Sequence, residues 1–126
     1  MEMSRIYLLL FNEYKTILLI ALGAVPGSLI RWQFNNDFFV NILGATVFGF
    51  LVGFPFRSSK KLIIGVGFCG ALTTFSGWIL DALKLLISGF FFQAFGLIFY
   101  TFSLGLLAAF FGFCIGRKVN PLRLFL

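Results

Sequence analysis

Apolar residues occur in four long runs that charged residues separate from one another. The uncharged runs cover residues 16–30, 38–56, 62–80 and 85–116. A helix that crosses the hydrocarbon core of a bilayer needs about 20 apolar residues, within a range of roughly 17 to 25. The pattern therefore predicts an all-α membrane protein with a single domain, residues 1–126, whose four transmembrane helices lie at about 15–34, 38–56, 62–86 and 90–116.

The beginning of the chain fits this pattern less simply. The first run is short for a span, so Arg31 at its end is expected either to reach the interface or to line a polar cavity. We interpret residues 1–14 as a short N-terminal helix that lies in the membrane interface. A secretory signal peptide is the alternative, but no typical small-residue cleavage site follows residues 17–20.

Composition supports the membrane assignment. Hydrophobic residues make up 60% of the chain, charged residues only 11%, and 20 residues are Phe. A soluble domain carries about 25% charged residues, and a short chain cannot bury this much apolar surface. His is absent, and Cys69 and Cys114 lie in apolar runs without the spacing of a metal or redox site. His-based catalysis is excluded and no nucleophile–base pair is visible, so we do not expect an enzyme.

Basic residues outnumber acidic ones by ten to four, but they stand at the ends of the apolar runs. This placement is typical of membrane-flanking anchors rather than of a nucleic-acid-binding face. Arg31 and Lys84 fall on one side of the predicted membrane, and the other eight fall on the opposite side: Arg5, Lys15, Arg57, Lys60, Lys61, Arg117, Lys118 and Arg123. Basic loops stay in the cytoplasm. We predict a multi-pass protein of the cell inner (plasma) membrane with both termini cytoplasmic.

The third run carries polar residues that a lipid-facing helix does not need. From Gly65 to Trp78 it holds four glycines and three hydroxyl residues. Glycine weakens a helix by about 1 kcal/mol relative to alanine, and Ser and Thr can bond to helix carbonyls and bend the helix. We expect a break at mid-membrane near residues 70–76, where freed carbonyls and amides could bind an ion. A kinked structural helix agrees equally well with the composition.

Two further features concern the contacts between helices. Glycines four residues apart let two helices approach closely, and such pairs recur as Gly23/Gly27, Gly49/Gly53 and Gly112/Gly116. Asn41 is the one amide deep in the second run, where it either bonds a neighbouring helix or lines a pore. No carboxylate lies deep in a predicted span, whereas a proton-coupled carrier normally needs one.

Three blocks of sequence together resemble the Fluc (CrcB-type) fluoride channels. The first block, residues 23–32, is rich in glycine and ends in Arg31 and Trp32, and the second, residues 41–49, begins with Asn41. The third, Gly-Phe-Cys-Gly-Ala-Leu-Thr-Thr-Phe-Ser at residues 67–76, is similar to the family signature almost letter for letter. The resemblance covers most of the chain from residue 23 to the end of the fourth predicted helix.

The resemblance implies a dimer of four-helix subunits packed antiparallel, with two fluoride pores at the interface and passive export of toxic fluoride. It also implies a structural sodium ion at the dimer centre, held by the backbone carbonyls of the broken third helix. On the matching positions these carbonyls belong to Gly70 and Thr73. Membrane lipid surrounds such a dimer, and its second subunit is either a copy of this chain or a paralogue of opposite orientation.

The resemblance further implies that fluoride contacts come from the amide at position 41, from phenylalanine ring edges and from nearby hydroxyls. A small, strongly hydrated anion needs replacement donors in a pore, and amides, hydroxyls and the positive edges of aromatic rings supply them. For the hydroxyls of the fourth helix a structural role is equally consistent. The candidate pore residues are Arg31, Asn41, Thr74, Phe75, Ser76, Trp78, Tyr100 and Ser103.

The chain departs from the family pattern in three ways. Gly77 and Trp78 stand where Thr and Phe usually follow the Phe-Ser pair, so the pore built on Trp78 could be altered or blocked. The first loop is shorter than usual. The third departure is the strong basic bias, which suits one half of a pair of oppositely oriented subunits better than a homodimer that inserts both ways.

Two other functions are alternatives. A small multidrug-type antiporter also has four helices in an antiparallel pair, but it needs a glutamate inside the first span, and Glu2 and Glu13 both lie outside it. A membrane scaffold that transports nothing is favoured only if the third helix is unbroken.

Overall fold

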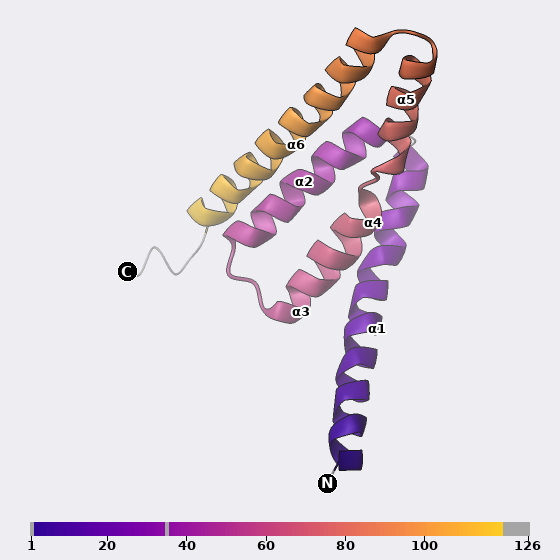
Figure 1. Ribbon diagram of the computed structural model, residues 1–126. Coiled ribbons are helices and arrows are strands. Elements are labelled where there is room, and N and C mark those ends of the chain that lie inside the picture. Colours follow the sequence, from indigo (N-terminus) through magenta and orange to yellow (C-terminus); the bar gives the residue numbers. More distant parts are fainter. Residues whose placement is uncertain (1, 35, 120–126) are drawn as a thin grey trace.

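The computed structural model describes residues 2–34 and 36–119, and every regular element in these ranges is a helix (Figure 1). The helices are α1 (Glu2–Phe34), α2 (Asp37–Gly53), α3 (Ser58–Lys60), the π-helix η1 (Lys61–Cys69), α4 (Gly70–Leu72), α5 (Ser76–Ile87) and α6 (Phe91–Lys118). The segments α3, η1 and α4 follow one another without a gap. The all-helical fold expected from the sequence is confirmed.

Helix ends differ from the predicted bounds where the local sequence explains it. α1 runs from Glu2 to Phe34 without interruption, so no break separates residues 2–14 from the first predicted span. Glycine and proline are absent from residues 2–22, and nothing there ends a helix. α2 ends at Gly53 instead of residue 56 because Pro55 forces Phe54 into an extended conformation (φ −100°, ψ 140°). At its other end, the Asn36 side chain caps α2 by accepting from Phe39 N–H at 3.0 Å.

Three helical stretches within the described residues are long enough to span a membrane. Asn12–Phe34, Ser58–Ile87 and Phe91–Lys118 are long and apolar enough to cross a bilayer. α2 is apolar but shorter, with 17 residues. Many large apolar side chains in these helices are exposed, among them Phe92 at 96% and Trp32 at 80%. A surface this apolar is suited to lipid or to a second subunit and not to water.

Glycine positions decide which helices touch. A β-carbon at Gly49 or Gly53 of α2 would overlap the backbone of Ala109 or Phe113 in α6, and one at Gly112 or Gly116 of α6 would overlap the backbone of Thr46 or Phe50 in α2. The same holds where α1 meets the third helix: Gly23, Gly27 and Gly67 each leave room only for the facing backbone. The packing role predicted for the three glycine pairs is confirmed.

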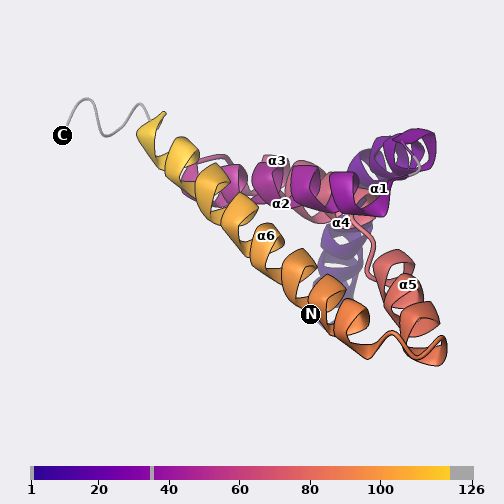
Figure 2. The ribbon, with the colours of Figure 1, turned by 90° about the horizontal axis from the view of Figure 1, so that it is seen from above.

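The third helical stretch is not continuous. After α3 comes the nine-residue π-helix η1, and the N–H of Gly70, the residue that follows η1, bonds back to the Gly65 carbonyl. Helical structure stops at Leu72 and resumes at Ser76, and Thr73 between them is extended (φ −77°, ψ 152°). Viewed from above, α5 leaves the direction of α4 and lies beside the beginning of α6 (Figure 2). The non-helical residues 73–75 therefore stand at the point where the chain passes from α1 and α2 towards α6.

Candidate functional site

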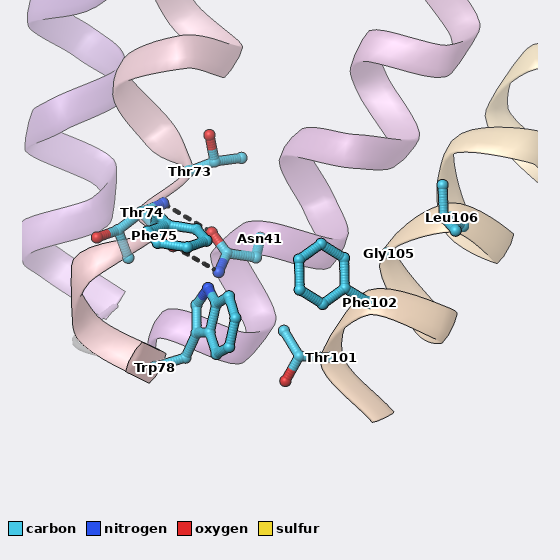
Figure 3. Close-up of a pocket in the computed structure, with 9 residues that line it drawn as sticks. All are labelled: Asn41, Thr73, Thr74, Phe75, Trp78, Thr101, Phe102, Gly105 and Leu106. Carbon is cyan, nitrogen blue, oxygen red and sulfur yellow. Dashed lines mark hydrogen bonds between the residues drawn. The ribbon is translucent and has the colours of Figure 1, made fainter. Parts of the chain in front are cut away.

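Asn41 binds the interrupted segment through both ends of its side-chain amide. Its Nδ2 donates to the Thr74 carbonyl at 2.8 Å, and Thr74 N–H donates to Asn41 Oδ1 at 2.7 Å (Figure 3). Residues outside a helix lose their usual backbone partners, which is costly away from water. Asn41 replaces both partners of Thr74. A primary amide carries two N–H donors, so the second one remains for another ligand.

The backbone carbonyls of Gly70 and Thr73, close to Thr74, have fewer hydrogen-bond partners. Arg31 Nη1 donates to the Thr73 carbonyl at 3.3 Å, a long hydrogen bond. In a continuing helix Thr74 N–H would bond to the Gly70 carbonyl, but here it bonds to Asn41 instead. Gly70 itself is exposed, and nothing lies within 4 Å of the place for its β-carbon. Gly70 and Thr73 thus present carbonyl oxygens with unused capacity to accept.

Carbonyl oxygens are also the metal ligands that this region offers. Across residues 2–34 and 36–119, no three His, Cys, Asp or Glu side chains gather into a metal-binding group. Sodium is a hard cation and binds oxygen, including backbone carbonyls at broken membrane helices. The two carbonyls predicted to hold sodium, those of Gly70 and Thr73, are therefore chemically suited to it.

An aromatic cavity of about 320 Å³ lies beside the Asn41–Thr74 contact. Phe75 and Trp78 meet edge to face, with ring centroids 5.0 Å apart and an interplanar angle of 81°. Trp78 and Phe102 of α6 meet in the same way at 5.6 Å and 84° (Figure 3). Ring edges carry partial positive charge. The full lining is Asn41, Thr73, Thr74, Phe75, Trp78, Thr101, Phe102, Gly105 and Leu106.

A second, polar cavity of about 380 Å³ adjoins the first through Thr74, which lines both. Its lining is Ser28, Arg31, Trp32, Asp37, Thr74, Ser76 and Gly77. The Thr74 and Ser76 hydroxyls lie 3.3 Å apart, so one can donate to the other. The two cavities together place six of the predicted pore residues in one region: Arg31, Asn41, Thr74, Phe75, Ser76 and Trp78.

The two predicted residues of the fourth helix lie elsewhere. Tyr100 is 55% exposed and stacks on Phe38 at 5.5 Å, and neither it nor Ser103 lines either cavity. Thr101 lines the aromatic cavity instead. Thr101 is 9% exposed, and its buried Oγ1 has no hydrogen-bond partner within the described residues.

Sequence reasoning missed Thr101 although it stands in the same hydroxyl-bearing stretch as Tyr100 and Ser103. One signal could have found it, because Thr101 and Gly105 are four residues apart and share one helix face. A small residue one turn away leaves open space beside a hydroxyl. An orphaned buried hydroxyl has a cost unless a ligand or water satisfies it.

Comparison with known proteins gives consistent matches over most of the chain. Residues 18–113 match the family model described as CrcB-like protein, Camphor Resistance (CrcB). A relative from Prochlorococcus marinus (strain MIT 9313), "Fluoride-specific ion channel FluC 2", is 49% identical over 87% of this chain and 89% of its own length. A protein of the same name from Synechococcus sp. (strain CC9902) is 45% identical over 89% and 87%.

A third relative carries a different number in its name. "Fluoride-specific ion channel FluC 1" from Prochlorococcus marinus (strain SARG) is 46% identical over 86% of this chain and 87% of its own length. The region that matches the family model contains every residue that lines the two cavities.

Proposed function

Because this chain belongs to the CrcB-like family, we propose that it is a subunit of a fluoride-specific ion channel that passively exports fluoride from the cytoplasm and so lowers its toxicity. The relatives named as fluoride channels support this function over 86–89% of the chain. The observation that carries the proposal is the Asn41–Thr74 contact, which sets an amide with a spare N–H donor against an aromatic cavity.

The cavity offers weak, neutral donors to an anion. Fluoride must exchange its hydration shell for protein donors and must still be able to leave. The spare N–H of Asn41 and the ring edges around Trp78 can supply such contacts. Thr101 lines the same cavity, and a turn of its side chain would add a hydroxyl that has no partner within the described residues. Full positive charges would hold the anion too long. Trp78 adds an indole N–H, and Figure 3 shows its ring nitrogen pointing toward the Asn41 amide.

The function of this family is transport and not catalysis, so the two alternatives differ from it within membrane proteins. The antiporter alternative is not favoured, because the relatives carry the name of channels. The scaffold alternative required an unbroken third helix, whereas helical structure is absent from residues 73–75. We interpret this gap as the mid-membrane break expected for the channel.

We further propose that two subunits pack antiparallel and that a structural sodium ion lies at their centre. The carbonyls of Gly70 and Thr73 would hold it, since both have unused accepting capacity. When bound, the ion supplies positive charge to oxygens of both subunits. Antiparallel twofold symmetry would bring the two interrupted segments together. The extensive exposed apolar surface, including Phe75 at 64%, leaves room for a subunit as well as for lipid.

The second subunit is proposed to be a paralogue of opposite orientation, with a homodimer as the alternative. The chain is a multi-pass membrane protein, and its basic residues favour insertion into the inner membrane with both termini cytoplasmic. An antiparallel dimer needs one subunit in each orientation. Relatives that carry the numbers 1 and 2 are in keeping with paired subunits.

Liposomes loaded with potassium fluoride test the function and the partner together. The purified chain, alone and with a paralogue of opposite Lys/Arg bias, is reconstituted, and efflux is followed with a fluoride electrode. We expect fluoride efflux without chloride efflux, and the largest rate from the mixture. Equal fluoride and chloride rates would overturn the fluoride assignment. A full rate from the chain alone, with a C-terminal reporter present equally on both sides of the membrane, would replace the paired subunits by a homodimer.

A further inference from the structure

A carboxylate occupies an unusual position in the polar cavity. Asp37 is the first residue of α2, and its carboxylate fills the space in which a β-carbon at position 77 would stand. Gly77 lies in the first turn of α5. The side chain of Asp37 reaches this place only because residue 77 has none. The contact thus joins α2 directly to α5, in addition to the bonds that Asn41 makes with the interrupted segment.

The carboxylate shares its cavity with one positive charge. Arg31 and Asp37 both line the polar cavity, and both are half-buried. They do not form an ion pair: the one ion pair within the described residues joins Asp81 to Lys84 on the exposed face of α5. Arg31 instead donates to the Thr73 carbonyl. The cavity therefore carries two opposite charges whose effects on an entering ion add, so that one offsets the other.

The polar cavity and the aromatic one share a wall. Thr74 lines both, and its hydroxyl lies 3.3 Å from that of Ser76 in the polar cavity. An anion that enters the polar cavity and passes Thr74 to reach Asn41 meets the carboxylate of Asp37 on the way. Fixed charges at the mouth of a narrow, low-dielectric path change the local concentration of ions, and like charge lowers it.

We propose that Asp37 sets the rate of anion entry: its carboxylate, seated against Gly77, opposes fluoride in the polar cavity and offsets the attraction of Arg31. This inference rests on the proposed channel function. It assigns to Gly77 the role of admitting the carboxylate and to Asp37 that of limiting the rate. Neutral residues at position 37 therefore speed transport, which a residue serving only to hold α5 in place would not do.

Fluoride efflux from liposomes at low and high ionic strength tests the proposal. Asp37→Asn removes the charge and keeps the shape, and we expect its efflux rate to rise about threefold to tenfold at low ionic strength. Addition of about 0.5 M potassium isethionate should reduce this ratio toward one, because salt screens the charge. Asp37→Ser provides a second neutral variant if Asp37→Asn fails to assemble. The matched control is Asp81→Asn, which removes a carboxylate outside both cavities and should leave the rate unchanged.

The outcomes separate this inference from the function on which it rests. Fluoride efflux by the wild-type protein combined with an unchanged or reduced rate in an assembled neutral variant overturns the role of Asp37 and leaves the channel intact. An increase that does not depend on salt also overturns it, because it would report a change of packing. Absence of fluoride efflux from the wild-type chain, alone and with its paralogue, overturns both.

Discussion

Helix α2 is held by opposite means along its two halves. Towards its C-terminal end it meets α6 backbone against backbone, through Gly49 and Gly53. Near its N-terminal end it meets residues 73–75 side chain against backbone, through the amide of Asn41. The first contact is apolar and closed, and it uses only shape. The second leaves an N–H donor and carbonyl oxygens unused beside a cavity, so it can hold the fold and still bind an ion.

The comparison predicts that assembly is most sensitive to added side-chain volume at the glycine contact between α2 and α6. Gly112→Ala places a methyl group on the backbone of Thr46, and overpacking of this kind costs typically about 1–3 kcal/mol and occasionally more. We expect loss of most of the assembled protein, measured by size-exclusion chromatography in detergent before and after heating. Gly96→Ala in the same helix is the matched control, because nothing lies within 4 Å of the place for its β-carbon. Equal yields from the two variants would contradict the packing role.

The N-terminal half of α2 should respond in transport and not in assembly. Asn41→Asp keeps an acceptor for Thr74 N–H but removes the donors and places a negative charge beside the cavity. In a low-dielectric pore this charge repels an anion strongly, so we expect fluoride efflux to fall by at least about tenfold. Efflux is measured in liposomes on protein that elutes as the wild type does.

Asn12→Asp makes the same chemical change on an exposed part of α1 and should leave the efflux rate as it is. Wild-type efflux from a correctly assembled Asn41→Asp protein would remove Asn41 from the ion path. Loss of assembly in Asn41→Asp would instead show that the Thr74 contact is as structural as the glycine contact.

Local patterns were enough to predict the helices and the glycines at which they pack. Apolar runs bounded by charges give the helices, and glycines four residues apart give the faces that touch. The predicted bounds differ from the structure at two places: α1 runs on from Glu2 because no glycine or proline interrupts residues 2–22, and α2 stops early, at Gly53, because of Pro55.

Contacts between residues far apart in the sequence could not be predicted from local patterns. Asn41 and Thr74 are 33 positions apart, and nothing in either neighbourhood specifies that they bond to each other. The approach of Asp37 to Gly77 is a similar case. In α6 apolar residues surround the whole helix, so the apolar pattern does not indicate which hydroxyl residue lines the cavity. Only the spacing of Thr101 from Gly105 points to it, and Thr101 was passed over in favour of Tyr100 and Ser103.

Thr101 gives the smallest and most discriminating test of the comparison. Thr101→Val keeps the shape of the side chain and removes a hydroxyl that has no partner within the described residues. Because no hydrogen bond within the protein is lost, we expect the thermal midpoint to stay the same or rise slightly. Fluoride efflux should fall about threefold to tenfold, as expected when one hydrogen bond of about 1 kcal/mol to the passing anion is lost. Thr46→Val is the matched control: the Thr46 hydroxyl donates to the Ile42 carbonyl of its own helix and lines neither cavity. Its loss should leave efflux unchanged. If the two variants reduce efflux equally, the role of Thr101 is in packing, like that of the glycines between α2 and α6, and α6 supplies no donor to the aromatic cavity.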